Sequence, residues 1–365
     1  MSLSAIAGKV REGVPLSHAD GLALFQHPNL MEVGALANEV RERLHGDRTY
    51  FNRNLHINPT NVCVASCKLC SFSRRRADAE GAFVLGVDEA VAKLRGRLEV
   101  GDRVTEVHLV GGLHDGLPFD YFTRLLASLK AAAPGISLKA FSAVEIFFFH
   151  RLYGMTIEEI LRRLQSAGLD SLPGGGAEIL SSRVREAICP NKCGADEWLE
   201  VHRTAHRLGI KSNCTMLFGT VETLEERVDH LLLLRGQQTE SAGFMAFIPL
   251  PFHPENNALG DRPAPTAAEV LRTIAVARLV LHNVPHIKAY WVSLGLATAQ
   301  TALWFGADDF DGTVSEEKIY HEAGSLSPQA LAGDEISRLV RAAGRVPVER
   351  DTLYSHVPQA SGEAI

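Results

Sequence analysis

Short runs typical of β-strands alternate with longer amphipathic segments through most of the chain, and this alternation constrains the fold more than any other feature. Eight runs are expected to be strands: 54–60, 103–111, 136–143, 169–174, 210–219, 243–250, 285–292 and 307–313. The segments between them repeat apolar residues at intervals of three and four, as amphipathic helices do: 87–100, 118–133, 156–168, 195–209, 223–236 and 266–283. Strands that alternate with helices form βαβ units around a parallel sheet. The sequence therefore predicts an α/β protein.

Eight βα units are the number that closes a TIM-type (β/α)8 barrel, a fold of about 250 residues. The predicted units occupy 51–315, so this range is expected to be the barrel. Residues 1–50 are expected to form an N-terminal helical extension, with Ser17 and Asn29 as helix N-caps. Residues 316–365 are expected to form a C-terminal helical segment and a tail that pack on the barrel. A doubly wound open sheet is the alternative arrangement of the same units.

Composition argues against several classes of partner and location. The formal net charge is -6, which gives no reason to expect nucleic acid or a membrane surface as a partner. No window approaches about 18 uninterrupted apolar residues, so no membrane span is expected. The first residues lack the apolar run of a signal peptide, and we expect a cytoplasmic protein. In that compartment, six cysteines indicate reduced thiols that serve a metal or catalysis.

Three of the cysteines stand close together in the segment NPTNVCVASCKLCSF, directly after the first predicted barrel strand. Cys63, Cys67 and Cys70 follow a Cys-x3-Cys-x2-Cys spacing. Three thiolates can hold a [4Fe–4S] cluster and leave one iron open to bind and activate a substrate. In a barrel, catalytic groups lie at the C-terminal ends of the strands, which is where this loop is predicted. The spacing therefore predicts a catalytic iron–sulfur cluster.

Two other interpretations of this segment are weaker. A structural zinc site needs four ligands, and the nearest further candidate, His56, lies on the predicted strand itself. Offsets of four and three also place small core residues on one face of a helix, but Asn58, Pro59 and Asn61 argue against a helix that continues from upstream. Buried thiols are expected at the remaining cysteines, Cys189, Cys193 and Cys214.

The cysteine motif followed by Phe72 resembles the signature of the radical S-adenosylmethionine (SAM) superfamily. Further segments are similar to the aminofutalosine synthase family of the futalosine route to menaquinone: VGGLH, KAFSAVEI, GLDSLPGGGAEIL, AFIPLPFHPENN, HIKAYW and ADDFDGTV. The resemblance covers residues 50–354. It implies that the open iron of the cluster binds SAM, and that one electron cleaves SAM to methionine and a 5′-deoxyadenosyl radical.

The resemblance also implies a transferase that forms a C–C bond. The adenosyl radical adds to the vinyl carbon of 3-[(1-carboxyvinyl)oxy]benzoate, and the adduct rearranges and loses a carboxyl group as bicarbonate. The product is 6-amino-6-deoxyfutalosine, SAM is a consumed cosubstrate, and a flavodoxin or ferredoxin is the implied electron donor. Alternatives with the same architecture are dehypoxanthine futalosine cyclase and the subunits that make the deazaflavin ring. An alternative of another class is a non-catalytic iron–sulfur or zinc scaffold.

Residues at the predicted strand ends are candidates for SAM binding. Gly111 and Gly112 stand where the superfamily brings backbone close to the SAM amino group, and glycine permits that approach. Phe72 is expected to face the adenine, and Glu145 is expected to bind the ribose hydroxyls. Contact with SAM or substrate is expected for a glycine run and the acid after it: Gly174, Gly175, Gly176 and Glu178. A purely structural role, as a turn, a core ring or an ion pair, is the alternative in each case.

The implied substrate carries two carboxylates, which need cations or strong hydrogen-bond donors. Candidates near the expected barrel mouth are His114, His253, His286 and Lys288. His286 and Lys288 flank one strand position, so their side chains are expected to point to the same face. Fifteen histidines are present, so a structural role is the alternative for any one of them. A solvated face, or a surface for an anionic electron donor, is expected at Arg74, Arg75 and Arg76.

Overall fold

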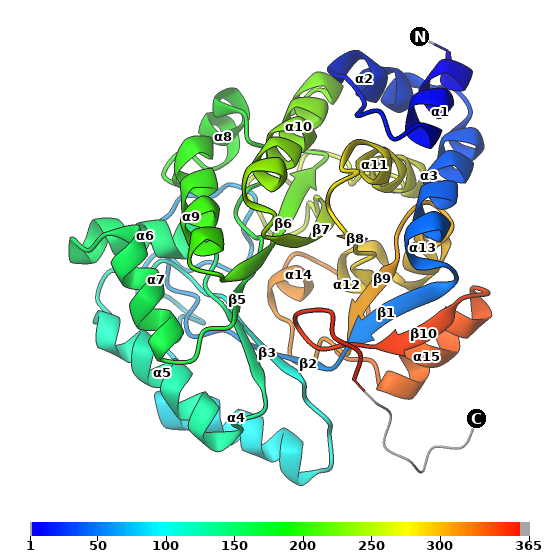
Figure 1. Ribbon diagram of the computed structural model, residues 1–365. Coiled ribbons are helices and arrows are strands. Elements are labelled where there is room, and N and C mark those ends of the chain that lie inside the picture. The colour runs from blue at the N-terminus through cyan, green and yellow to red at the C-terminus, as the bar shows by residue number, and fades with distance from the viewer. Residues whose placement is uncertain (1, 358–365) are drawn as a thin grey trace.

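The computed structural model describes residues 2–357, and its centre is a parallel sheet of seven strands. The strands follow one another in chain order: β2 (Asn54–Ile57), β3 (Glu106–Leu109), β4 (Ser137–Ala140), β5 (Ser171–Leu172), β6 (Lys211–Phe218), β7 (Phe244–Pro251) and β8 (His286–Ile287). Figure 1 shows the sheet curling around a central space, with helices outside it. Each strand falls within or overlaps one of the predicted runs.

An eighth strand, β9 (Asp309–Gly312), closes the curled sheet into a barrel. On one side, Lys288 directly after β8 forms a parallel bridge with Asp309. On the other side, Leu55 of β2 forms a parallel bridge with Ser315. The predicted α/β barrel of eight strands is therefore confirmed, and the doubly wound open sheet is wrong. Isolated bridges, rather than full ladders, make the closure.

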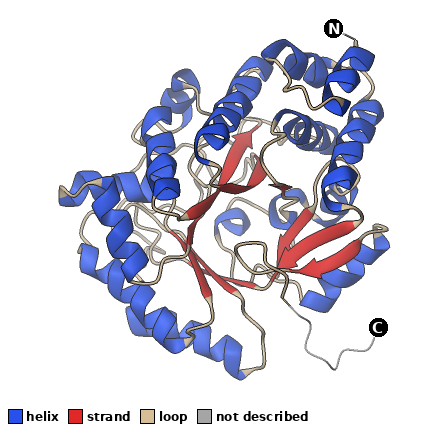
Figure 2. Ribbon diagram, viewed as in Figure 1, coloured by secondary structure: helices blue, strands red, loops and turns tan. Residues whose placement is uncertain are grey.

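Six helices cover the outside of the barrel, as predicted: α4 (Val87–Glu99), α5 (Phe119–Ala132), α7 (Ile157–Ser166), α9 (Ala195–Arg207), α10 (Leu224–Ser241) and α11 (Ala267–Val280). Figure 2 shows these helices surrounding the strands. Thr156, Thr223 and Thr266 are N-caps, and each hydroxyl accepts a hydrogen bond from a backbone N–H of the first turn. Further helices lie in the connections: α6 (Ala143–Tyr153), α8 (Ser182–Ile188), α12 (Trp291–Leu294), α13 (Leu296–Ala302) and α14 (Ile319–Glu322).

Three helices precede the barrel: α1 (Leu3–Arg11), α2 (His18–Gln26) and α3 (Leu30–His45). The predicted N-caps are confirmed, because Ser17 accepts a hydrogen bond from the Asp20 N–H at 3.3 Å and Asn29 accepts one from the Met31 N–H at 3.0 Å. Helix α2 packs on α10 and α11, α3 packs on α11, and α1 contacts α2 and α3. In Figure 1, α1 and α2 lie at the top and α3 runs down the right-hand side. No helix between residues 2 and 357 combines the length and apolar character needed to cross a membrane.

A second, three-stranded parallel sheet joins the two ends of the chain. Its central strand β1 (Arg48–Asn52) pairs with β9 on one side and with β10 (Val346–Glu349) on the other. The helix α15 (Gly333–Ala342) precedes β10, and Figure 1 shows both beside β1. The sequence analysis predicted neither β1 nor β10. Segments from opposite ends of the chain therefore complete one structural unit.

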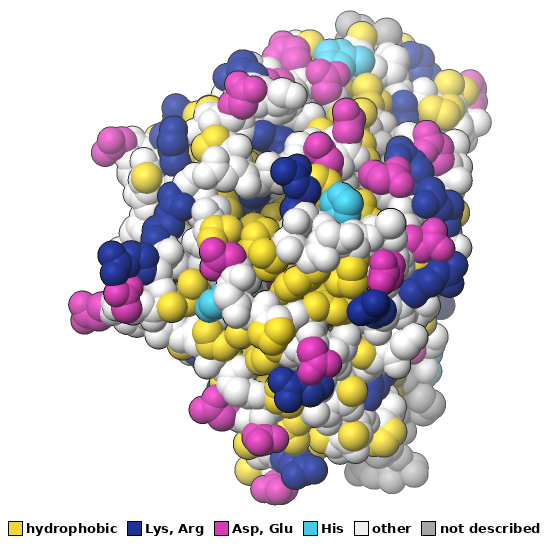
Figure 3. Space-filling model, turned by 90° about the vertical axis from the view of Figure 1, so that its left-hand side faces the viewer, with side chains coloured by type: hydrophobic (Ala, Val, Ile, Leu, Met, Phe, Trp, Pro, Cys, Tyr) yellow, Lys and Arg dark blue, Asp and Glu magenta, His cyan; other side chains and the backbone are white. Residues whose placement is uncertain are grey.

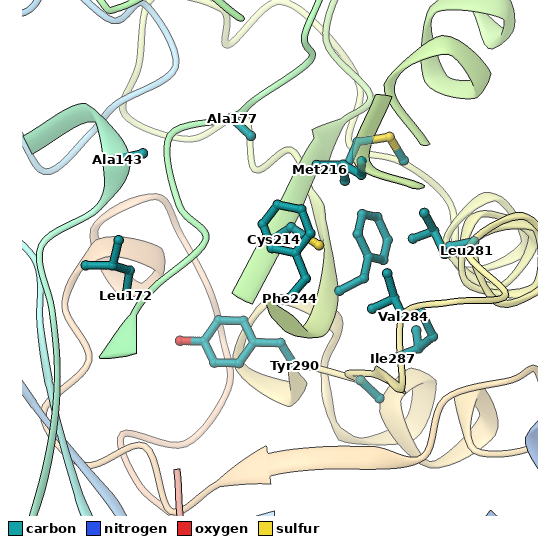
Figure 4. Close-up of a cluster of buried hydrophobic side chains, with 14 of the residues drawn as sticks. Ala143, Leu172, Ala177, Cys214, Met216, Phe244, Leu281, Val284, Ile287 and Tyr290 are labelled. Atoms are coloured by element: carbon teal, nitrogen blue, oxygen red, sulfur yellow. The ribbon is translucent and has the colours of Figure 1, made fainter. Parts of the chain in front are cut away.

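Figure 4 shows part of the apolar core beside β6 and β7. Cys214 and Met216 of β6 and Phe244 of β7 lie near Leu281 and Val284, which belong to the connection before β8. All five side chains are buried. The prediction that three thiols are buried is confirmed for Cys189, Cys193 and Cys214.

A buried ion-pair cluster ties the N-terminal extension to the barrel floor, which we define as the N-terminal ends of the strands. Asp308, directly before β9, is fully buried and pairs with the Arg278 guanidinium of α11. Its carboxylate also lies 2.5 Å from His286 Nδ1 and 3.4 Å from Nε2 of His45 on α3. Burial alone would raise the pKa of Asp308, but His286 and Arg278 hold it well below its usual range. The carboxylate is therefore ionised and links four elements.

Candidate active site

A cavity of about 320 Å³ begins among the loops that follow the strands and continues into the barrel lumen. Most predicted site residues line it: Cys63, Cys67, Cys70, Phe72, Gly111, Gly112, Glu145, Gly174, Gly175, Gly176, Glu178, His253 and Lys288. Two predicted substrate residues, His114 and His286, do not line it.

Figure 3 shows the side of the molecule that carries α6 and α7, where hydrophobic side chains form a band across the middle and charged ones lie around it.

The cysteine loop, residues 58–74, follows β2 and is held by backbone hydrogen bonds to other loops. The Val64 N–H donates to the Leu113 carbonyl after β3 at 3.0 Å, and the Lys68 N–H donates to the Ile188 carbonyl at the end of α8 at 2.8 Å. No helix forms between residues 58 and 74, so the interpretation of the cysteines as one face of a helix is wrong. The loop is an irregular segment that presents three thiols to one space.

The thiol arrangement fits a cluster better than a single zinc ion. With zinc–sulfur bonds of about 2.3 Å, the thiolates of a tetrahedral zinc site lie about 3.8 Å apart. Within residues 2–357, the one group of three metal-binding side chains with ligand atoms closer than 4.8 Å is the floor cluster, not the three cysteines. Burial raises the pKa of Cys67 to about 12 and also raises that of Cys63. Thiolates at these positions therefore need a bound metal group to stabilise their charge.

The loop after β3 packs directly on the cysteine loop. The Gly112 N–H donates to the Thr60 carbonyl at 2.8 Å, and a Cβ atom on Gly112 would lie 2.2 Å from the Val62 carbonyl oxygen. Any larger residue at Gly112 would therefore displace the backbone that carries Cys63. Both glycines line the cavity, and their contact with SAM stays a prediction.

Glu145 lies in the first turn of α6, directly after β4, and lines the cavity. It forms a capping box with Ser142, and its Oε1 accepts a hydrogen bond from the Gly111 N–H at 3.1 Å. Burial raises the pKa of Glu145 to about 7, although the bonds from Ser142 and Gly111 act in the opposite direction. The carboxyl group therefore has a structural role already, and it titrates near neutral pH.

The glycine run after β5 is tightly packed at its first position. A Cβ on Gly174 would lie 2.6 Å from the Cα of Cys214, and Gly176 has a φ of +85°. Gly175, in contrast, has nothing within 4 Å of such a Cβ. The run therefore needs glycine for packing and for its turn, and Gly175 alone offers open backbone to a ligand.

Glu178 is buried and forms an ion pair with Lys192, which is partly buried and which the sequence analysis missed. Lys192 also lines the cavity, beside the cysteines. Burial works against its charge, but Cys67 and Glu178 hold the pKa of Lys192 well above its usual value. Its signal in the sequence was the segment CPNKC, which places a lysine between two buried thiols.

The predicted substrate residues separate into two groups. Lys288 is buried in the lumen with Nζ 3.3 Å from an Asp311 oxygen, and His253 Nε2 lies 2.9 Å from the Ser293 carbonyl. His286, although two residues from Lys288, lies at the barrel floor, where its ring stacks on Tyr354 at 3.7 Å.

His114 has a local partner, because its Nδ1 accepts a hydrogen bond from the Gly116 N–H at 3.0 Å. The roles of His114 and His286 in substrate binding stay predictions, and neither side chain lines the cavity.

The residues just after the cysteines mainly organise the loop itself. Phe72 is 4% exposed and packs edge-on against Phe83. Arg74 donates to the carbonyls of Ser71 and Phe72 and pairs with Glu322 at 3.2 Å. Of the three arginines that were predicted to form a solvated face, Arg74 is therefore engaged with the protein.

Other polar residues that the sequence analysis missed point into the lumen from the strands. They are Asn54, His56, Glu106, His108, Lys139, Asn213 and Thr215. Alternation along a strand places every second side chain in the lumen, but the sequence alone does not show which alternate set that is.

Two family descriptions match the chain. Residues 57–234 match the radical SAM superfamily, and residues 241–362 match the C-terminal region of CofH/MqnC. The chain is 48% identical over 359 residues to an aminodeoxyfutalosine synthase of Thermus thermophilus, with 97% of this chain and 96% of that protein covered. It is 45% identical over 365 residues to an aminodeoxyfutalosine synthase of Streptomyces coelicolor, with 97% and 94% covered.

More distant relatives have other names. A 5-amino-6-(D-ribitylamino)uracil–L-tyrosine 4-hydroxyphenyl transferase of Methanosarcina acetivorans is 39% identical over 350 residues, with 94% of this chain and 91% of that protein covered. Among solved structures, methylornithine synthase has a TM-score of 0.76 at 18% identity, with 94% of this chain and 97% of that chain covered. At such low identity, this likeness concerns the fold alone.

Proposed function

The chain belongs to the radical SAM superfamily and, within it, to the family of the aminodeoxyfutalosine synthases, and on this premise we propose that it makes 6-amino-6-deoxyfutalosine for menaquinone biosynthesis. The substrates are SAM and 3-[(1-carboxyvinyl)oxy]benzoate, and bicarbonate and methionine are released. When bound, a [4Fe–4S] cluster and SAM supply the 5′-deoxyadenosyl radical that adds to the vinyl carbon. The observation that carries the proposal is identity of 45–48% over nearly the whole chain, together with a cysteine triad that lines the cavity in the barrel.

The residues around the cavity have distinct tasks in this proposal. Cys63, Cys67 and Cys70 hold the cluster. Lys192, beside Cys67 and paired with Glu178, offers a positive charge to the carboxylate of SAM. The apolar part of the lining keeps water and stray hydrogen donors away from the reacting carbon, and the barrel holds that carbon near C5′ of SAM.

The decisive experiment is an anaerobic reaction of the reduced protein with SAM and each candidate substrate, read by mass spectrometry. With the aryl enol ether, the adenosyl group should be incorporated into the product. With dehypoxanthine futalosine, a futalosine cyclase would convert the adenosyl group of SAM to free 5′-deoxyadenosine, and a 4-hydroxyphenyl transferase would consume tyrosine with the ribitylaminouracil. Product from dehypoxanthine futalosine, or from tyrosine with the ribitylaminouracil, and none from the enol ether would overturn the proposal. SAM cleavage upon reduction excludes a non-catalytic scaffold.

We further propose that the reducing electron comes from a low-potential protein such as a flavodoxin or ferredoxin, and that the protein works in the cytoplasm. Both follow from the need to keep three thiols reduced and to reduce a cluster. Arg76 is exposed near the cysteine loop and offers one positive group to an acidic partner, although it also pairs with Asp78 at 2.5 Å.

Glu145→Gln is expected to weaken SAM binding about tenfold at a pH of about 8, because a ribose hydroxyl bonds more strongly to a carboxylate than to an amide. Since the pKa of Glu145 is about 7, wild-type affinity for SAM should rise as the pH increases through this value and the carboxyl group ionises. The variant should lack this rise. Titration calorimetry at pH values on both sides of neutrality measures both effects. Glu159→Gln, on the exposed face of α7, is the matched control, and unchanged SAM affinity in Glu145→Gln refutes the role.

Lys288→Met is expected to raise KM for the enol ether about tenfold or more, while SAM cleavage without substrate continues. The substitution removes a cation from the lumen that would face a substrate carboxylate. It also leaves Asp311 without its partner, so Lys288→Met/Asp311→Asn is the control that removes the buried pair as a unit. Wild-type KM and turnover in both variants would show that Lys288 is not an anchor, and His253 would become the better candidate.

A further inference from the structure

The depth of the lumen holds two imidazole rings that have no task in the proposed function. His56 of β2 and His108 of β3 stand opposite each other in the parallel register, with ring centroids 4.6 Å apart and ring planes inclined by 3°. Both rings line the cavity. Within residues 2–357, the buried Nε2 of His56 has no hydrogen-bond partner. The pair therefore offers at least one hydrogen-bonding nitrogen, His56 Nε2, that the protein itself does not satisfy.

The neighbouring charges are, in contrast, already paired. Lys139 continues the same row, opposite His108 on β4, and its Nζ lies 2.6 Å from a Glu106 oxygen. Lys288 lies 3.3 Å from an Asp311 oxygen. Each lysine thus donates to a carboxylate of the protein, which reduces the net charge that it offers to an anion. His56 Nε2 is the imidazole nitrogen without a partner among the described residues, so an anion that enters this part of the lumen meets an open polar atom on the imidazole pair, beside the two lysines.

The position of the pair along the strands says which end of the substrate it meets. His108 precedes Gly111 by three residues, which at about 3.3 Å per residue places it about 10 Å nearer the barrel floor. The vinyl carbon must lie near SAM, at the cluster end of the cavity, and the enol-ether carboxylate is attached to the neighbouring carbon. The aryl carboxylate lies on the far side of the ring, so it points toward the floor.

We propose that His56 and His108 form the subsite for the aryl carboxylate of the substrate, and that they fix the ring so that its enol ether faces SAM. This inference rests on the proposed function and deepens it, because it names the group that selects a meta-carboxylated ring. The two histidines are positioning residues, since they hold the end of the substrate that does not react.

Proton uptake accompanies binding in this arrangement. Burial lowers the pKa of His108 well below its usual value and also lowers that of His56, so both rings are neutral before the substrate arrives. A carboxylate beside the rings favours the protonated form. The charged groups that face the pair from other positions are Glu106, Lys139, Lys288, Asp311 and Glu317.

The test is titration calorimetry of the enol ether and of its benzamide analogue, in which a carboxamide replaces the aryl carboxylate, on the cluster-loaded protein under anaerobic conditions. The wild type should bind the benzoate about tenfold or more tightly than the benzamide, with proton uptake that buffers of different ionisation enthalpy reveal. His108→Phe keeps a stacked ring but removes the nitrogens. It should lose this preference and the proton uptake, and bind the benzamide as the wild type does.

Further variants separate this inference from effects on folding. His108→Gln retains an N–H donor and should restore part of the preference, and His56→Gln should reduce it independently. His150→Gln, on α6 and outside the cavity, should match the wild type. A His108→Phe variant that keeps the tenfold preference overturns the subsite while leaving the proposed function intact. A wild-type protein that neither binds nor converts the enol ether overturns the proposed function instead.

Discussion

Iron content near zero, with SAM cleavage at background level, is the expected result for Cys67→Ala after anaerobic reconstitution. Cys67 is one of three thiols that line the cavity, and two thiolates leave the cluster too few protein ligands to retain it. The wild type should hold about four iron atoms per chain, as one [4Fe–4S] cluster requires. Iron analysis and the visible absorption of the cluster measure the loss.

The remaining thiols provide the matched controls for that experiment. Cys214→Ala changes a buried core thiol on β6, and Cys189→Ala changes a buried thiol near the end of α8. Both variants should keep about four iron atoms and cleave SAM. An iron content near eight in the wild type, or a cluster retained by Cys67→Ala, would contradict the assignment of Cys63, Cys67 and Cys70 as the complete ligand set.

Asp308→Ala should lower the free energy of unfolding by about 3–5 kcal/mol, because it leaves the buried Arg278 guanidinium without its carboxylate. The His286 ring and the Ile287 N–H lose the same partner. Denaturation by guanidinium chloride, followed by circular dichroism, measures the loss. Asp229→Ala, which removes an exposed carboxylate 3.4 Å from His18, should change stability by less than about 1 kcal/mol. Equal stability of the two variants would show that the floor cluster adds nothing.

The alternation of strands and helices was enough to predict the barrel, since all eight predicted runs contain a barrel strand. The strands β1 and β10 escaped prediction for a physical reason. Each is short, and the strand partners that it has within residues 2–357 lie about 260 to 300 residues away along the chain, so no local pattern reveals the pairing. The N-caps at Ser17 and Asn29 could be predicted because capping depends on neighbouring residues alone.

In the candidate site too, features set by residues close in sequence could be predicted, and features set by the pairing of distant strands could not. The cysteine triad is a local pattern, and its spacing alone indicated a cluster. The imidazole pair is not, because His56 and His108 are neighbours only through the register of two strands. His286 and Lys288 show a further limit: strand alternation predicts which face a side chain takes, but not its depth along the barrel.

The sheet that β1 shares with β9 and β10 also determines the order of events during synthesis. When β1 has just been translated, its neighbours β9 and β10 are still about 260 and 300 residues from being made. At roughly 5–20 residues per second, this delay lasts on the order of tens of seconds. For most of that time the cysteine loop has been made, but the barrel around it lacks β9, the strand that closes it. Delivery of iron and sulfide can therefore take place while the wall is still open, until β9 is made and closes the barrel.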